Sequence, residues 1–282
     1  KIDLISPSLV SKFFRKAATS PFSVVVCRSF AKISSFKNIR CLCVSSENIS
    51  GELSNLPESV EEIYCMNNQI TSIILPRKTK ILFCSGNIIR SLSLPEGIVR
   101  VSCENNFIRS LIVPKSVQFL DVDNNSLETL FLNGPLKSIS CSNNQLTNLS
   151  LFEGTKNIVC KNNNFESLLI PSGAKRVICS NNFISSLKTP DSVVELTCSN
   201  NCLTYLKLNL GMKKLICCFN LIENLQLPEG IEEVDCSRNL MSHLDVPQSV
   251  KEISYFTGNC FTRELSLPRG CKDIIFNASW LL

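Results

Sequence analysis

The chain has 282 residues, 44% of them hydrophobic, and carries a net charge of +5 at pH 7. This excess of positive charge is too small to favour nucleic acid as a partner. No apolar run approaches the roughly eighteen residues that a membrane-spanning helix needs, so the sequence predicts no membrane contact.

Residues 1–35 are predicted to form a helical hairpin. Ser-Pro pairs at positions 6–7 and 20–21 each place a helix-capping serine before a proline suited to the first helical turn. Apolar residues follow both pairs at helical spacing, which predicts helices over 7–18 and 21–34. Because an array of repeats needs caps over its open ends, we assign this hairpin to an N-terminal cap.

Residues 36–254 form an array of repeats with a period of nineteen residues. An irregular copy occupies 36–64, and ten regular copies follow, each with a cysteine (once a valine) three positions before an asparagine. The cysteines are Cys65, Cys84, Cys103, Cys141, Cys160, Cys179, Cys198, Cys217 and Cys236, with Val122 in the remaining copy. The asparagines are Asn68, Asn87, Asn106, Asn125, Asn144, Asn163, Asn182, Asn201, Asn220 and Asn239. A fixed period of this length is typical of a solenoid.

Each copy is predicted to contribute one short strand to a parallel sheet. In the first regular copy Ile63 and Cys65 face inward while Tyr64 and Met66 face outward, as the two-residue period of a strand requires. The asparagine then turns the chain and satisfies buried backbone groups. Most copies return through Leu-Pro, and proline keeps the preceding residue extended. The fold is therefore predicted to be an α/β solenoid of leucine-rich repeats with a parallel concave sheet, an extended convex side and an N-terminal helical cap.

The ladder of cysteines is predicted to be buried, unpaired packing. Side chains on adjacent parallel strands point the same way rather than toward each other, which disfavours disulfides. Zinc is the alternative, but short C-x-x-C pairs are missing and His243 is the only imidazole. Sixteen cysteines kept unpaired indicate a reducing compartment. We therefore expect no metal and no cofactor.

Residues 255–282 depart from the period. This segment contains Phe256, Phe261, Phe276 and Trp280. It is predicted to be an aberrant last repeat followed by a C-terminal cap.

The outward positions of the strands provide the candidate binding surface. Their first third is unusually apolar and aromatic, as is typical of an interface. The candidate partner-binding residues are Tyr64, Met66, Ile81, Phe83, Arg100, Glu104, Phe119, Asp121 and Asp123. The alternative is that the N-terminal cap folds over the aromatic residues.

A second candidate surface is the column just before the strands. It contains Lys80, Lys137, Lys156, Lys175, Lys213 and Lys251. A basic column could bind acidic protein or phosphate, although lysines at such a flank more often keep a sheet edge soluble.

The pattern at Leu94–Leu111 and Leu227–Leu244 resembles the short repeats of secreted effectors of pathogenic bacteria, the invasion plasmid antigen H and Yop M group. In that family a helical hairpin precedes the repeats, and the repeats bind host proteins. The family carries valine or leucine where this chain carries cysteine. Several members append a ubiquitin ligase domain with a catalytic cysteine, and no cysteine of this sequence can be matched to it.

The resemblance implies a monomeric, non-catalytic module that a bacterium delivers into the host cytoplasm to bind a host protein. One alternative is a substrate-recognition or adaptor module for ubiquitin ligation, acting through an F-box-like N-terminus or a ligase domain outside this chain. An extracellular adhesin is a third hypothesis. An enzyme is disfavoured because His243 has no second imidazole with which to build a nucleophile–base pair.

Overall fold

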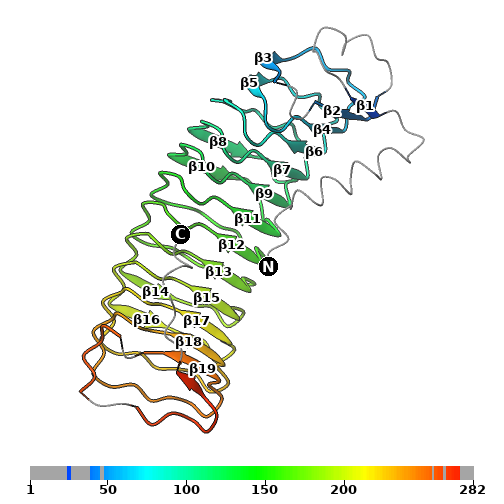
Figure 1. Ribbon diagram of the computed structural model, residues 1–282. Coiled ribbons are helices and arrows are strands. Elements are labelled where there is room, and N and C mark those ends of the chain that lie inside the picture. Colours follow the sequence, from blue (N-terminus) through cyan, green and yellow to red (C-terminus); the bar gives the residue numbers. More distant parts are fainter. Residues whose placement is uncertain (1–23, 27–38, 45–47, 256, 263–264, 274–282) are drawn as a thin grey trace.

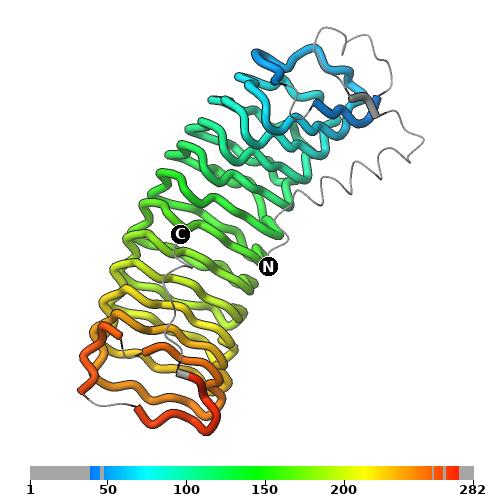
Figure 2. Tube along the Cα trace, in the orientation of Figure 1, coloured from blue at the N-terminus to red at the C-terminus, as the bar shows by residue number. Residues whose placement is uncertain are grey.

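The computed structural model describes residues 24–26, 39–44, 48–255, 257–262 and 265–273. These residues form a stack of similar turns, drawn as a gently curved rod in Figure 1. The large parallel sheet runs along the inner side of the curve, and Figure 2 shows the same succession of turns as a tube. The predicted parallel sheet on the concave side is therefore confirmed.

The large sheet has fourteen strands in the order in which they follow along the chain. They are β1 Val24–Val26, β2 Cys41–Cys43, β4 Glu62–Tyr64, β6 Ile81–Phe83, β7 Arg100–Ser102, β9 Phe119–Asp121, β11 Ser138–Ser140, β12 Asn157–Val159, β13 Arg176–Ile178, β15 Glu195–Thr197, β17 Lys214–Ile216, β18 Glu233–Asp235, β19 Glu252–Ser254 and β20 Lys272–Asp273. We call each of these strands a rung. From β4 to β19, each rung residue pairs with the residue nineteen positions further on, for example Ile139 with Ile158.

The return legs are extended, as predicted. Three pairs of short parallel strands form there: β3 Ser50–Leu53 with β5 Gln69–Ile73, β8 Ser110–Val113 with β10 Thr129–Leu132, and β14 Ser186–Lys188 with β16 Tyr205–Lys207. The described residues contain no helix. No helix in this part of the chain is therefore long and apolar enough to cross a membrane.

The N-terminal cap differs from its prediction. Val24–Val26 form strand β1, which pairs with β2 through Val24–Cys41, Val25–Leu42 and Val26–Cys43. This corrects the helix predicted over 21–34, because three consecutive β-branched residues favour an extended strand that can extend the sheet. The helix predicted over 7–18 lies outside the described residues.

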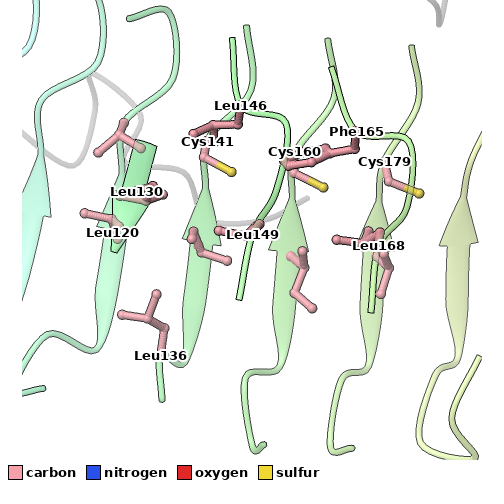
Figure 3. Packing of buried hydrophobic residues seen from close by; sticks show 14 of the residues in the cluster. Leu120, Leu130, Leu136, Cys141, Leu146, Leu149, Cys160, Phe165, Leu168 and Cys179 are labelled. Carbon is pink, nitrogen blue, oxygen red and sulfur yellow. The ribbon is translucent and has the colours of Figure 1, made fainter. Parts of the chain in front are cut away.

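The core is one continuous column of apolar side chains between the sheet and the return legs. All nine ladder cysteines are fully buried, and Val122 occupies the same position in its turn. Figure 3 shows Cys141, Cys160 and Cys179 at equivalent places on successive rungs, with Leu146, Phe165 and the leucines of the return leg packed against them. Tyr255 takes the rung position after Cys236 and is also buried.

Each asparagine of the predicted column forms hydrogen bonds that link two turns. The Asn144 amide donates to the carbonyls of Val122 at 3.0 Å, Cys141 at 3.1 Å and Ser142 at 3.0 Å. Its Oδ1 accepts the N–H of Leu127 at 2.9 Å. Nine further asparagines repeat the donation, and Asn259 continues it one residue later than the period would place it. The predicted role of this column is confirmed.

The residue just before each of these asparagines is in the left-handed region of backbone space. Asn143 has φ 55°, and most turns place asparagine or, at Gly86, glycine there. The asparagines also bond to one another, as where Asn200 donates to Asn181 at 2.7 Å. In two consecutive turns the position holds Phe219 at φ 56° and Arg238 at φ 52°. Neither side chain suits this conformation, which costs about 1–2 kcal/mol at each such residue.

Phe219 and Arg238 also contact each other. The Arg238 guanidinium carbon lies 4.8 Å from the centre of the Phe219 ring. This cation–π contact replaces the amide–amide bond of the neighbouring turns and offsets part of the strain.

The bonded asparagines, such as Asn144, and the left-handed residues just before them, such as Asn143, provide a test of the register. Asn144→Ala leaves the buried N–H of Leu127 without its acceptor and removes one of two donors from each of three carbonyls. We expect a loss of about 2–4 kcal/mol, because an unmet buried group costs about 1–3 kcal/mol and each lost hydrogen bond adds to it. The matched control is Asn143→Gly, which keeps the left-handed turn and is expected to cost less than about 1 kcal/mol. Unfolding in urea measures both. Equal losses would contradict the assigned roles.

The cysteines provide a second test. The described part of the chain holds fifteen cysteines, none of them in a disulfide, and eleven of these are buried. In native reduced protein we expect rapid reaction with a thiol reagent at the exposed Cys202 and Cys260, and slower reaction at Cys41 and Cys271. The ladder cysteines react only after denaturation, because burial raises the pKa of thiols such as Cys84 well above the usual value. Mass spectrometry of labelled peptides reads this out, and labelling of the ladder under native conditions would be inconsistent with it.

Candidate functional site

The concave face is formed by the outward residues of the rungs. Within each rung the middle residue belongs to the core, so its two neighbours point to the opposite side. The nine predicted binding residues lie on β4, β6, β7 and β9, or two positions beyond the end of these strands. The structure thus places all nine on one continuous surface across four adjacent rungs.

The aromatic residues at one end of this surface are not exposed. Tyr64 and Phe83 are each only 7% exposed, and with Cys43 they form a separate apolar cluster on the outward side of the sheet. Their rings are stacked with centroids 5.2 Å apart. We call Cys43, Tyr64 and Phe83 the aromatic cluster.

The aromatic cluster corrects one expectation from the sequence. Strand alternation placed Tyr64 and Phe83 correctly, but their rings are packed rather than open to solvent. Met66 and Ile81 are partly buried against the same cluster. Because large stacked rings stabilise the rungs that carry them, removing both rings would weaken the fold as well as any binding.

Beyond the aromatic cluster, Phe119 lies between two basic side chains. The Arg100 guanidinium carbon is 4.4 Å from the centre of the Phe119 ring, and the Lys137 ammonium nitrogen is 5.8 Å from it. Both distances fall within the range of cation–π attraction. All three residues come from adjacent turns, so the period of the array creates the contact.

Three carboxylates lie next to Phe119: Glu104, Asp121 and Asp123, which we call the acidic cluster. Burial is the main cause that raises the pKa of all three. The charges of Asp123 and Glu104 add to this at Asp121 and raise its pKa to about 7. The carboxylates are therefore close enough to disfavour one another's ionisation.

The protein positions the acidic cluster through hydrogen bonds. The hydroxyl of Ser140 donates to Asp123 at 2.8 Å, and the N–H of Ser142 donates to Asp123 Oδ1 at 2.6 Å. The N–H of Asp123 in turn donates to Asp121 Oδ1 at 3.2 Å. Strand alternation places Ser140 and Ser142 on this face, but their role was not predicted from the sequence. Their nineteen-residue offset from Asp121 and Asp123 was the signal that could have shown it.

The basic column before the strands is partly engaged within the chain. Lys213 pairs with Glu232 at 3.4 Å, and Lys251 pairs with the same carboxylate at 2.5 Å. Lys80 donates to the carbonyl of Gly97 at 3.3 Å. These contacts favour the interpretation of the column as a solvated flank over a separate binding site.

Neither a metal centre nor a nucleophile–base pair is assembled in the part of the chain that the structure describes. No group of three His, Cys, Asp or Glu side chains there has an arrangement able to hold a metal ion. His243 lies 3.1 Å from Asp245, and both side chains are mostly exposed on the return leg. What the geometry offers is an extended surface with charged and aromatic groups.

These features define a leucine-rich-repeat solenoid. No family model and no curated protein sequence matches the chain. Among solved structures it is similar to YopM from Yersinia enterocolitica WA-314, with a TM-score of 0.62 and 23% identity over 83% of this chain and 64% of that one. It is also similar to YopM, a leucine-rich effector protein from Yersinia pestis, with a TM-score of 0.58 and 24% identity over 80% and 62% of the two chains.

A third similar structure shares the cysteine feature. It is the functional domain of InlJ from Listeria monocytogenes, described as including a cysteine ladder, with a TM-score of 0.53 and 22% identity over 70% of this chain and 44% of that one. The predicted resemblance to Yop M repeats thus holds at the level of the fold. The chain spans less than two thirds of the length of each of these three proteins.

The raised pKa of Asp121 predicts how stability depends on pH. An unfolded aspartate titrates near pH 4 and Asp121 titrates at about 7 in the fold, so its contribution to stability is fully present below pH 4 and is lost as pH rises through 7. We expect Asp121→Asn to match the original protein at pH 4 and to be more stable at pH 8. Urea unfolding at both values measures this, with Asp191→Asn at an exposed position as the control. A constant difference between the two pH values would contradict the assignment.

Proposed function

We propose that this chain is a non-catalytic protein-interaction module that binds a partner through its concave sheet. The observation that carries this proposal is the surface around Phe119. There, three half-buried carboxylates, an aromatic ring and two basic groups are held on rigid strands. Clustered perturbed carboxylates are more common at functional sites than on inert surfaces, and aromatic and arginine side chains dominate protein interfaces.

The accessible binding residues are the partly exposed members of the predicted set: Met66, Ile81, Arg100, Glu104, Phe119, Asp121 and Asp123. Tyr64 and Phe83 are packed against the sheet at one end of the site and support it, rather than serving as exposed contact residues. Because this support is rigid, the free surface loses less conformational entropy on binding.

The partner is a host protein, and the chain works as a monomer that a bacterium secretes into the host cytoplasm. The likeness of the fold to YopM supports this assignment. The many unpaired cysteines fit a reducing compartment. The ubiquitin-ligation alternative requires either an F-box-like N-terminal segment, of which the structure describes only Val24–Val26 as strand β1, or a ligase domain outside this chain.

The proposal is tested by introducing the same large side chain on the concave face in one variant and on a return leg in another. Ser138 lies on β11 beside Phe119, whereas Ser150 is exposed on a return leg. Affinity capture from reduced host-cell lysate with the original chain should retain a specific protein. Ser138→Tyr should lower its retention more than about tenfold, a loss of about 1.4 kcal/mol, and Ser150→Tyr should not.

The pair of variants also shows how the proposal fails. If both variants keep the captured protein, or if both lose it equally, the concave face is not the binding surface. Circular dichroism of both variants checks that the fold is intact.

A further inference from the structure

We propose that an exposed apolar stripe toward the C-terminal end of the array is a second interaction surface, one that binds an amphipathic helix of a partner protein. The stripe is formed by the position just after the bonded asparagine, where the chain starts its return leg. In five successive turns this position holds an apolar side chain or a thiol: Phe183, Cys202, Leu221, Leu240 and Cys260. We call these five residues the apolar stripe. Because it lies beyond the strands of the concave face, this inference goes beyond the proposed function.

Hydrogen bonds between turns show that the apolar stripe is continuous. The N–H of Cys202 donates to the carbonyl of Ile184 in the preceding turn at 3.0 Å. The N–H groups of the other four stripe residues make the equivalent bond at 2.8 or 2.9 Å. Neighbouring stripe residues are therefore one rung apart, about 4.8 Å, and the five residues extend over about 19 Å.

The side chains of the apolar stripe are open to solvent. Phe183, Leu221 and Leu240 are 56%, 46% and 44% exposed, and both cysteines are exposed. The same position is polar in the three preceding turns, at Ser126, Gln145 and Asn164. Single exposed apolar side chains are ordinary on a protein surface, whereas a contiguous run of them is typical of an interaction site.

An independent observation is the backbone strain in the same turns. Phe219 and Arg238, at φ 56° and 52°, lie two residues before Leu221 and Leu240. Elsewhere in the array this left-handed position holds asparagine or glycine, which adopt it at lower cost. Strained residues of this kind are concentrated at binding sites, where the side chain they present has a use. Here the strain places an aromatic ring and a guanidinium beside the apolar stripe.

The Arg238 side chain is held in position. Its guanidinium carbon lies 4.8 Å from the centre of the Phe219 ring. A Cβ atom added at Gly258 would lie only 2.8 Å from Arg238 Cγ, so the next turn leaves just enough room for the arginine stem. Arg238 is exposed and has no ion pair among the described residues. The protein therefore fixes a cation beside Leu240 without supplying its carboxylate.

The charges beside the apolar stripe indicate what its partner carries. Glu223 follows Leu221 by two residues, is exposed, and likewise has no ion pair within the described part of the chain. Arg238 thus lies on one flank of the stripe and Glu223 on the other. A complementary partner has an apolar face with acidic residues along one side and basic residues along the other.

An α-helix matches the apolar stripe in length and spacing. About thirteen residues of helix span about 19 Å, and each helical turn rises about 5.4 Å, close to the spacing of the rungs. In an extended strand, side chains on one face are about 6.7 Å apart and fall out of step with the stripe after two rungs. Helices that bind in this way contact the surface through residues at i, i+3, i+4 and i+7.

A second copy of this chain would not supply the missing charges. In a two-fold pair with both stripes running in the same direction, Arg238 faces Ser242, which takes the position of Glu223 in its turn. In a pair running in opposite directions about Leu221, Glu223 faces the partner's Glu223, and like charges repel. The charges therefore favour a different protein as the partner.

The experiment uses the full chain and two fluorescently labelled peptides of about fourteen residues, followed by anisotropy at about 0.15 M salt. Both peptides carry leucines at i, i+4, i+7 and i+11, which form one face of a helix. The charged peptide has glutamates along one side of that face and lysines along the other. The neutral peptide has glutamine at all of these flanking positions.

We expect Leu221→Ser and Leu240→Ser each to weaken binding of both peptides at least about tenfold. The matched control is Phe107→Ser, which removes a 50% exposed side chain from the same position in a turn outside the stripe. It should bind within about twofold of the original chain. Circular dichroism checks that all three variants are folded.

The two peptides also test the charges. The original chain should bind the charged peptide about fivefold more tightly than the neutral one, as two exposed ion pairs allow. In the double variant Arg238→Gln, Glu223→Gln this preference should disappear while the neutral peptide still binds. A purely structural role of Arg238 would not change the preference between peptides.

Several results would overturn the inference. They are no binding of either peptide at millimolar concentration, equal losses in Phe107→Ser and Leu221→Ser, and no preference of the original chain for the charged peptide. A dimer in sedimentation that Leu221→Ser abolishes would assign the apolar stripe to a second copy. Binding to vesicles of phosphatidylcholine and phosphatidylserine that Leu221→Ser abolishes would assign it to a membrane.

The outcome is separable from that of the proposed function. Ser138→Tyr on the concave face should leave binding of the charged peptide unchanged. If this variant loses the peptide, the peptide binds the concave face and the apolar stripe is not its site. If peptide binding behaves as expected but Ser138→Tyr does not affect capture of the host protein, the proposed function fails and the stripe remains.

Discussion

The bonding of one asparagine amide in each turn is the interaction on which the rest of the structure depends. The chain must leave the strand inside the array, where its backbone groups have no access to water, and the amide of Asn144 and its equivalents satisfies four of them across two turns. This fixes the spacing of the rungs and the register of the sheet. Every outward side chain, including the acidic cluster and Phe119, takes its position from that register.

Much of the architecture could be predicted because the period alone determines which residues face inward. The cysteine ladder, the asparagine column, the parallel sheet and the extended return legs all follow from alternation and spacing. The left-handed backbone conformation of the residue just before each bonded asparagine could not be predicted so readily. This position is occupied by asparagine in most turns, but Phe219 and Arg238 give no hint of φ > 0 in the sequence, because their conformation is imposed by the neighbouring turns rather than by their own preference.

The site was predicted less completely than the fold. Alternation showed which side of the sheet Tyr64 and Phe83 occupy, yet their burial depends on packing over the outward face, which a strand pattern does not describe. The strand at Val24–Val26 was missed for a related reason. Serine–proline caps favoured a helix locally, whereas pairing with β2 offered a sheet edge that local reasoning does not include. The electrostatic coupling of Glu104, Asp121 and Asp123 likewise arises only when separate turns are stacked.

The strained pair at Phe219 and Arg238 has a consequence for how the rod responds to mechanical load. Because each turn contacts only its neighbours, the array opens turn by turn instead of all at once. Turns with asparagine or glycine at the left-handed position lose no conformational strain on opening, whereas the turns of Phe219 and Arg238 release it. We therefore expect these two turns, toward the C-terminal end of the rod, to open under a lower load than turns with asparagine or glycine, by the part of the strain that the Arg238–Phe219 contact does not offset.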